Sequence, residues 1–232
     1  FGQGSTWNTV VDDIYILHQR LKQRYPDVPL CIMGHSMGSF LTRTYLIRYP
    51  GTVKAAVIMG TGWQPQAAIT GGLALANAIA AVSGENATSE LVTELAFGSY
   101  NKLFAPNRTK VDWLSADESN VDDYIADPLC GADATVGLFR QMLHGIRFNQ
   151  RQSHLRQMDR EMPVLFVAGD KDPVGNCGKG VRQTYDAFRA AGMRDCTLKL
   201  YPGLRHEILN EKAYTADITK NIEAWLLSRL EK

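Results

Sequence analysis

The chain has 232 residues, 45% of them hydrophobic and 21% charged, which is typical of one globular domain or of one domain with a large insertion. Its 25 basic and 24 acidic residues leave a formal net charge of +1 and are spread along the sequence. No basic block indicates a nucleic-acid partner, and no acidic tail indicates a solvating arm. The functional signals therefore have to come from local motifs.

The four cysteines, Cys31, Cys130, Cys177 and Cys196, include no C-x-x-C pair. The sequence therefore predicts neither a zinc site nor any other metal site. We expect a reducing, cytoplasmic setting, with a secreted disulfide-bonded protein as the alternative. Two glycosylation-type triplets, at residues 86–88 and 107–109, would matter only on a secretory route.

The longest apolar-leaning stretch, residues 67–82, is rich in Ala and Gly and is interrupted by Thr70 and Asn77. A transmembrane helix needs about 20 consecutive apolar residues. We therefore expect no integral membrane segment. The sequence from Phe1 onward also shows no signal-peptide pattern.

Hydrophobic spacing predicts alternating helices and strands in the first quarter of the chain. A helix is expected over residues 6–25, where apolar residues recur at helical spacing; these are Val10, Ile14, Leu17 and Leu21. A short apolar run at 30–33 predicts a strand that is buried on both faces, including Cys31. A helix over 37–49 and a second strand over 53–59 follow.

The rest of the chain divides into a long helical insertion and a second set of alternating elements. Residues 63–162 lack strong strand runs and are predicted to be mostly helical. Strands are then expected at 164–168 and 197–201, and helices at 181–191 and 210–230. The last helix presents one apolar face, made of Ile218, Ile222, Trp225 and Leu226. This order predicts a parallel α/β sheet built from residues 1–62 and 163–232, with 63–162 as a separate helical domain.

One motif carries chemistry directly, because Gly34-His35-Ser36-Met37-Gly38 fits the G-x-S-x-G nucleophile elbow. The predicted strand before it and the helix after it place Ser36 on a tight turn at the carboxyl end of the sheet. We expect both flanking glycines to avoid clashes, and His35 to point away from Ser36. The backbone N–H of Met37, at the start of the helix, is the natural first oxyanion donor.

A serine hydroxyl needs an adjacent base, and in this strand–elbow–helix context the partners follow in the order Ser, acid, His. Of the five histidines, His206 alone lies in a loop between the last predicted strand and the last helix. The acid is expected just past the strand at 164–168, where we favour Asp172 and keep Asp170 as the alternative. Asp170, being nearer the strand end, would then brace the turn.

Three motifs together resemble the monoacylglycerol lipase and lysophospholipase-like branch of the α/β-hydrolases, which also contains serine aminopeptidases. They are GHSMG at 34–38, AGDKDPVG at 168–175 and YPGLRHEILNE at 201–211. The resemblance spans nearly the whole chain and implies a triad of Ser36, Asp172 and His206. It also implies an α/β-hydrolase fold, with 63–162 as a cap over an acyl pocket and with no cofactor.

The chain departs from this family at its beginning, because family members start with several more strands. The loop that carries the second oxyanion donor in the family belongs to that region. We therefore expect the N-terminal part of the sheet and the second donor to be absent from this chain. A separate N-terminal segment is one partner that would complete the fold.

The expected function is hydrolysis of carboxylic esters by a serine nucleophile through an acyl-enzyme. The substrates implied by the resemblance are monoacylglycerols, lysophospholipids or small esters. A proline-type aminopeptidase or an acyltransferase on the same fold is the alternative. An aminopeptidase needs a carboxylate for the free amine, for which the insertion offers Glu85, Glu90, Glu94 and the pair Asp117-Glu118. A binding protein without activity is disfavoured because all three triad members are present.

Overall fold

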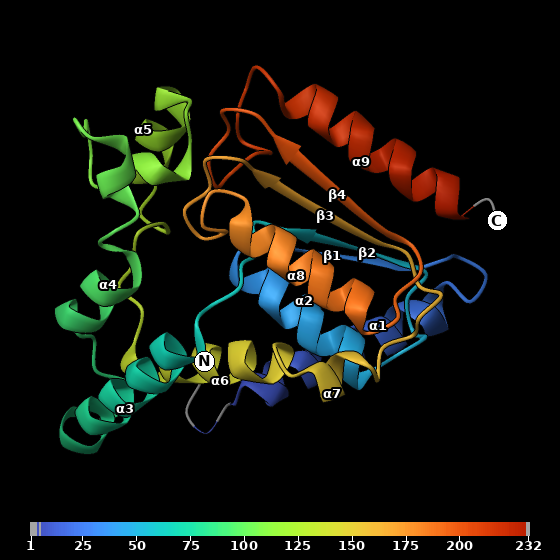
Figure 1. Ribbon diagram of the computed structural model, residues 1–232, viewed down its shortest axis with the longest axis horizontal. Helices are drawn as coiled ribbons and strands as arrows, with labels where there is room; N and C mark the ends of the chain where they lie inside the picture. The colour runs from blue at the N-terminus through green and yellow to red at the C-terminus, as the bar shows by residue number, and fades with distance from the viewer. Residues whose placement is uncertain (1–3, 5, 231–232) are drawn as a thin grey trace.

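A computed structural model describes residue 4 and residues 6–230, and this part of the chain contains one parallel sheet of four strands. The strands lie side by side in chain order (Figure 1). They are β1 (Cys31–His35), β2 (Ala55–Met59), β3 (Val164–Gly169) and β4 (Cys196–Tyr201). In the register, Val57 of β2 pairs with Met33 on one side and with Leu165 on the other.

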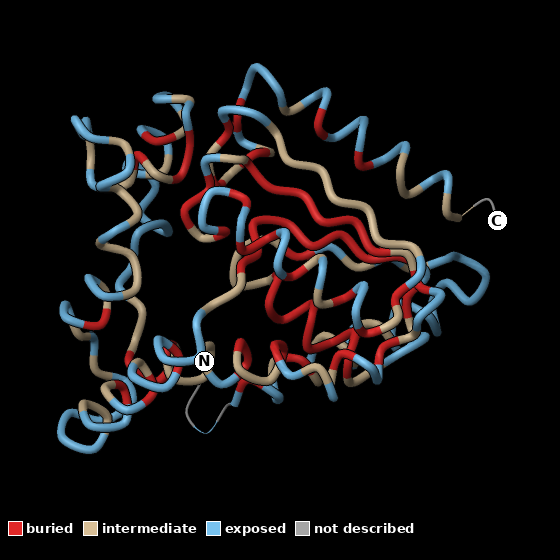
Figure 2. Tube along the Cα trace, in the orientation of Figure 1, coloured by how far each residue is buried: buried red, intermediate tan, exposed pale blue. Residues whose placement is uncertain are grey.

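Helices cover both faces of the sheet, as parallel strands require (Figure 1). Three of them lie on one face: α1 (Trp7–Arg24), α2 (Met37–Arg48) and α8 (Lys179–Ala190). The last helix, α9 (Thr215–Leu230), lies on the other face. All the residues of β2 and β3 are consequently buried, and these strands run red through the centre of Figure 2.

Successive side chains of β2 and β3 alternate between two hydrophobic clusters, as the two-residue period of a strand dictates. Ile58 and Phe166 belong to the larger cluster, with residues from α1, α2 and α8. The Phe166 ring there meets the Phe188 ring nearly at right angles, with 5.1 Å between centroids. Val57 and Leu165 face the second cluster, which α9 completes. The contacting side chains of α9 are Ile218, Ile222, Trp225 and Leu226.

The segment between β2 and β3 is helical and lies mostly beyond the carboxyl ends of the strands (Figure 1). Its α-helices are α3 (Gln66–Ser83), α4 (Glu90–Phe97), α5 (Glu118–Ala126), α6 (Val136–Asn149) and α7 (Gln152–Leu155). Two 3-10 turns, η1 (Asn101–Phe104) and η2 (Asp112–Leu114), join α4 to α5. Helix α6 packs against α1, α2 and α3, which ties the segment to the rest of the molecule.

The predicted α/β architecture is confirmed, since all four expected strands form one parallel sheet flanked by helices. The prediction that the first strand is buried on both faces is wrong. Cys31 is exposed and Met33 is 53% exposed. Both residues lie on the α9 side of the sheet, where α9 covers β2 and β3 but does not reach β1. In the part of the chain that the structure describes, β1 is an edge strand.

Two helices also differ in detail from the prediction. In α1 the buried residues are Trp7 and Val11, whereas Leu17 and Leu21 are exposed, because the second half of the helix extends past the residues that it packs on. Helix α9 begins at Thr215 rather than near Asn210, since residues 211–214 form a turn.

Among the described helices, α3 alone is long and apolar enough, by length and composition, to cross a membrane. Of the residues of α3, 17% are buried, and the helix packs against α6.

Candidate active site

Ser36 lies on a strained turn between β1 and α2. Its backbone has φ 55° and ψ −122°, a conformation that costs a non-glycine residue about 1–3 kcal/mol. The Ser36 amide donates to the carbonyl of Met59 at the end of β2, at 3.1 Å, which holds the turn against the neighbouring strand. Helix α2 begins at the next residue, so its amino-terminal end faces the same region.

The two glycines of the elbow have different roles. A Cβ at Gly34 would lie 2.2 Å from the carbonyl oxygen of Gly38 and 2.4 Å from the hydroxyl of Thr42. A Cβ at Gly38 would meet nothing within 4 Å. The expectation that both glycines avoid a clash therefore holds for Gly34 and is wrong for Gly38.

His206 and Asp172 form a buried pair at the carboxyl end of the sheet. The His206 Nδ1 atom lies 3.0 Å from each oxygen of the Asp172 carboxylate. The two residues are 2% and 0% exposed, so solvent does not compete for this contact. Asp172 also accepts from the amide of Val174 at 2.9 Å, which fixes the carboxylate in its loop.

Asp170 lies elsewhere in the same loop. Its carboxylate accepts a hydrogen bond from the amide of Gly203, at 2.8 Å, and this contact joins the loops after β3 and β4. Asp170 therefore braces the turn, while Asp172 meets the imidazole. Among the hydrogen bonds of the described residues, none joins the Ser36 hydroxyl to the His206 ring. Such contacts are often long before substrate binds.

His35 contacts His206, an arrangement that the sequence did not predict. Its Nε2 atom lies 3.1 Å from the carbonyl oxygen of His206, and the two rings are 4.6 Å apart between centroids. Burial, followed by the neighbouring His206 ring, lowers the pKa of His35. Since a carbonyl only accepts, Nε2 carries the proton and donates it. His35 thus anchors the backbone of the His206 loop to the end of β1.

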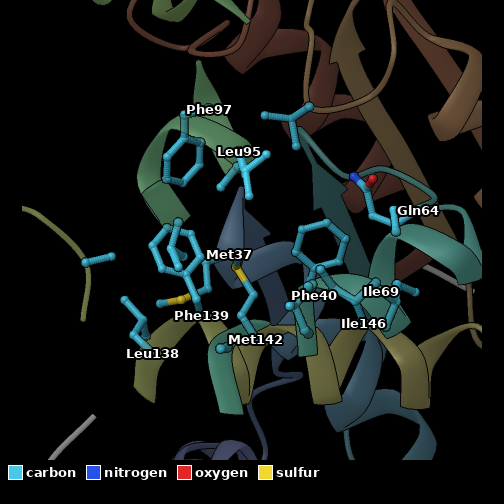
Figure 3. Close-up of a pocket in the computed structure, with 18 of the residues that line it drawn as sticks. Met37, Phe40, Gln64, Ile69, Leu95, Phe97, Leu138, Phe139, Met142 and Ile146 are labelled. Carbon is cyan, nitrogen blue, oxygen red and sulfur yellow. The ribbon is translucent and has the colours of Figure 1, made fainter. Parts of the chain in front are cut away.

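A cavity of about 540 Å³ opens beside Ser36 and Met37. Its walls come from α2, α3, α4 and α6, and Figure 3 shows side chains of these helices directed into one space. The large apolar residues around it include Met37, Phe40, Ile69, Leu95, Phe97, Leu138, Phe139, Met142 and Ile146. The elbow therefore borders an apolar cavity of the size that small-molecule ligands occupy.

Few polar side chains line the cavity. Gln64 enters it, and its own backbone is held by the side chain of Gln150 through two hydrogen bonds of 2.8 Å. Tyr100 also lines the cavity, together with Ser36 and the indole of Trp113. Burial, with a smaller contribution from the Asp172 carboxylate, raises the pKa of Tyr100 to about 12, so its hydroxyl stays protonated.

No charged side chain lines this cavity among the described residues. The carboxylates that an aminopeptidase could have used lie outside it. Glu85 pairs with Arg140, and Glu94 lies 3.7 Å from Lys102. In the described ranges, no three His, Cys, Asp or Glu side chains gather as they would around a metal ion.

Comparison with known proteins gives a consistent set of relatives. Residues 1–213 match the family model described as serine aminopeptidase, S33. The monoacylglycerol lipase of Mycolicibacterium smegmatis is 30% identical over 225 residues, which cover 95% of this chain and 70% of that protein. The monoglyceride lipase of Mus musculus is 26% identical over 233 residues, covering 97% of this chain and 67% of the relative.

Solved structures share the fold. A thermostable carboxyl esterase from Bacillus coagulans, in complex with glycerol, superimposes with a TM-score of 0.89 at 23% identity. The match covers 97% of this chain and 72% of the esterase. The monoacylglycerol lipase of Paleococcus ferrophilus has a TM-score of 0.71 at 18% identity, covering 97% of this chain and 76% of the lipase.

Proposed function

The chain belongs to the serine aminopeptidase S33 family of α/β-hydrolases, in its monoacylglycerol lipase-like branch, and from that membership we propose that Ser36, His206 and Asp172 are its catalytic triad. The chain is a carboxylic ester hydrolase. The observation that supports the triad most strongly is the buried contact of His206 with both oxygens of Asp172, at 3.0 Å.

In the proposed mechanism His206 acts as the general base. Asp172 holds Nδ1–H, which leaves Nε2 free to take the Ser36 proton as the serine oxygen attacks the ester carbonyl. The Met37 amide, at the positive end of the α2 dipole, donates to the resulting oxyanion. The carbon–oxygen bond to the alcohol then breaks, and His206 returns the proton to the leaving oxygen. Water, activated by the same imidazole, releases the acid from Ser36.

The substrate that we propose is a neutral ester with a single acyl chain, such as a monoacylglycerol. The apolar walls of the cavity suit the acyl chain, and Gln64 and Tyr100 are available for the alcohol. Lysophospholipids and aminoacyl amides carry charges in the headgroup or at the amine, and within the described part of the chain no charged side chain lines the cavity to receive them. Residues 63–162 would then be the cap, since α3, α4 and α6 supply most of the wall.

One assay tests this proposal. A short p-nitrophenyl ester, a monoacylglycerol, a lysophospholipid and an aminoacyl p-nitroanilide are each offered to the wild-type protein and to Ser36→Ala. We expect the neutral esters to be turned over best, and Ser36→Ala to lose at least about 1,000-fold in kcat. Unchanged ester turnover in Ser36→Ala would exclude Ser36 as nucleophile. Preference for the anilide would favour the aminopeptidase alternative.

A further inference from the structure

The loop that carries His206 is bound to one turn of the helical insertion. We define this docking turn as residues 112–117, which include η2. The carbonyls of Asp112 and Ser115 accept from the Arg205 guanidinium, the latter at 2.9 Å. The carbonyl of Leu114 accepts from the amide of Glu207 at 2.8 Å. Three carbonyls of the docking turn are thus satisfied by residues next to His206.

Glu211, which follows His206 in the sequence, also binds the docking turn. One of its carboxylate oxygens accepts from the amide of Ala116 at 2.8 Å, and the other accepts from the amide of Asp117 at 3.1 Å. Glu211 itself is 3% exposed, so its carboxylate is largely shielded from solvent, and hydrogen bonds to a carboxylate are of the stronger, charge-assisted kind. The Arg205 guanidinium on the carbonyls and the Glu211 carboxylate on the amides together fix the position and the orientation of the docking turn.

The docking turn places Trp113 against the catalytic pair. The Trp113 ring lies 5.2 Å from the His206 ring, tilted by 41°, and it also lines the cavity beside Ser36. Its amide donates to the side chain of Asn101, at 3.0 Å, and its ring meets the edge of the Tyr100 ring. With His35 on the His206 ring as well, the imidazole is enclosed by two aromatic neighbours from different parts of the chain.

We propose that Arg205 and Glu211 are positioning residues for the reaction, which act by seating Trp113 against His206. The inference rests on the proposed triad and extends it, because it makes docking of the insertion a condition for a correctly held base. The guanidinium of Arg205 also stacks on the Phe104 ring, with 4.0 Å between the guanidinium carbon and the ring centroid, and this contact further fixes its position. A misplacement of a catalytic group by about 1 Å can cost roughly 100-fold in rate, so a loosened turn has a measurable consequence.

The test uses Glu211→Gln, which keeps the shape of the side chain but loses one acceptor oxygen, and Arg205→Lys, which keeps the charge but loses the forked donor. Matched controls are Glu161→Gln and Arg194→Lys, since these two residues form an exposed ion pair of 2.6 Å elsewhere on the surface. We expect kcat for a short ester to fall by about 10- to 100-fold in the two test variants, with KM changed less than about threefold. Both controls should stay close to the wild type.

Two further readouts separate positioning from general stability. The low-field proton resonance of the His206 Nδ1–H should exchange faster with solvent in the test variants at temperatures where all the variants remain folded. In a double-mutant cycle, Glu211→Gln should add little to the loss in Trp113→Leu, whereas Trp113→Phe should restore most activity.

The inference is overturned if Glu211→Gln and Arg205→Lys match the wild type in kcat, or if their losses simply add to that of Trp113→Leu. Failure of the underlying function looks different, because Ser36→Ala would then hydrolyse the ester like the wild type. Inactive Ser36→Ala with fully active Glu211→Gln would remove the positioning inference alone.

Discussion

Each of the three side chains that we assign to catalysis follows a different strand of the sheet. Ser36 follows β1, Asp172 follows β3 and His206 follows β4. Their backbones are held by short contacts: Ser36 by the carbonyl of Met59, and the His206 carbonyl by His35. The strained backbone of Ser36 is therefore held from both sides: its amide donates to Met59 of β2, and its carbonyl accepts from the amide and the hydroxyl of Ser39 in α2.

At the residue scale, the structure allows a direct test of whether Asp172 or Asp170 is the acid of the proposed triad. Asp172→Asn keeps the shape of the carboxyl group but cannot hold the His206 tautomer, so we expect kcat to fall by between about 100- and 10,000-fold. Asp170→Asn retains an acceptor for the Gly203 amide and should cost little. Steady-state kinetics on a short ester compares the two, and a larger loss in Asp170→Asn would reverse the assignment.

The residue types and spacing of the motifs were enough to single out Ser36, Asp172 and His206 as candidates. The contact of His35 with His206 was not predicted, because the two residues are 171 positions apart and meet through the sheet. The space at Gly38 was also misjudged from the motif. Only the fold shows that the close approach of backbone in the elbow falls on Gly34.

At the scale of elements, the close packing of β1 against α2 across the elbow predicts how substitutions of the two elbow glycines change the stability of the fold. Gly34→Ala would place a methyl group 2.2 Å from the Gly38 carbonyl, so the strand and helix must separate. We expect a loss of about 3 kcal/mol or more in the free energy of unfolding. Gly38→Ala is the matched control, since it meets no atom and adds a better helix former. Urea unfolding of both variants tests this, and equal stability would show that the close approach is not as described.

Strands and helices with strong periodicity were predicted well, because β2, β3 and α9 are buried in the way that their apolar patterns require. The burial of β1 was predicted wrongly, because its run of apolar residues is like that of a central strand. A strand's place in a sheet depends on which neighbours pair with it, and local sequence does not contain that information.

At the scale of the whole molecule, the parallel sheet explains how distant residues reach one site. Parallel strands end at the same edge, so loops after β1, β3 and β4 had to converge there. The attachment of residues 112–117 to Arg205 and Glu211 could not be foreseen in the same way. It joins residues 90 to 95 positions apart through irregular backbone, and no periodic pattern marks either side.

The insertion and the sheet therefore act as one unit at the docking turn, while α3 and α4 form the apolar wall of the cavity. Leu95 illustrates the difference, because it lines the cavity and is still 65% exposed. The wall formed by α3 and α4 is thus partly open to solvent, whereas the docking turn is bonded to the loop that carries His206.

Covalent labelling with a p-nitrophenyl phosphonate, followed by peptide mapping in a mass spectrometer, tests the central claim most directly. The account predicts a single adduct on Ser36 in the wild-type protein and labelling at least about 100-fold slower in His206→Ala, which lacks the base. An adduct on another residue, or equally fast labelling of Ser36 in His206→Ala, would contradict it.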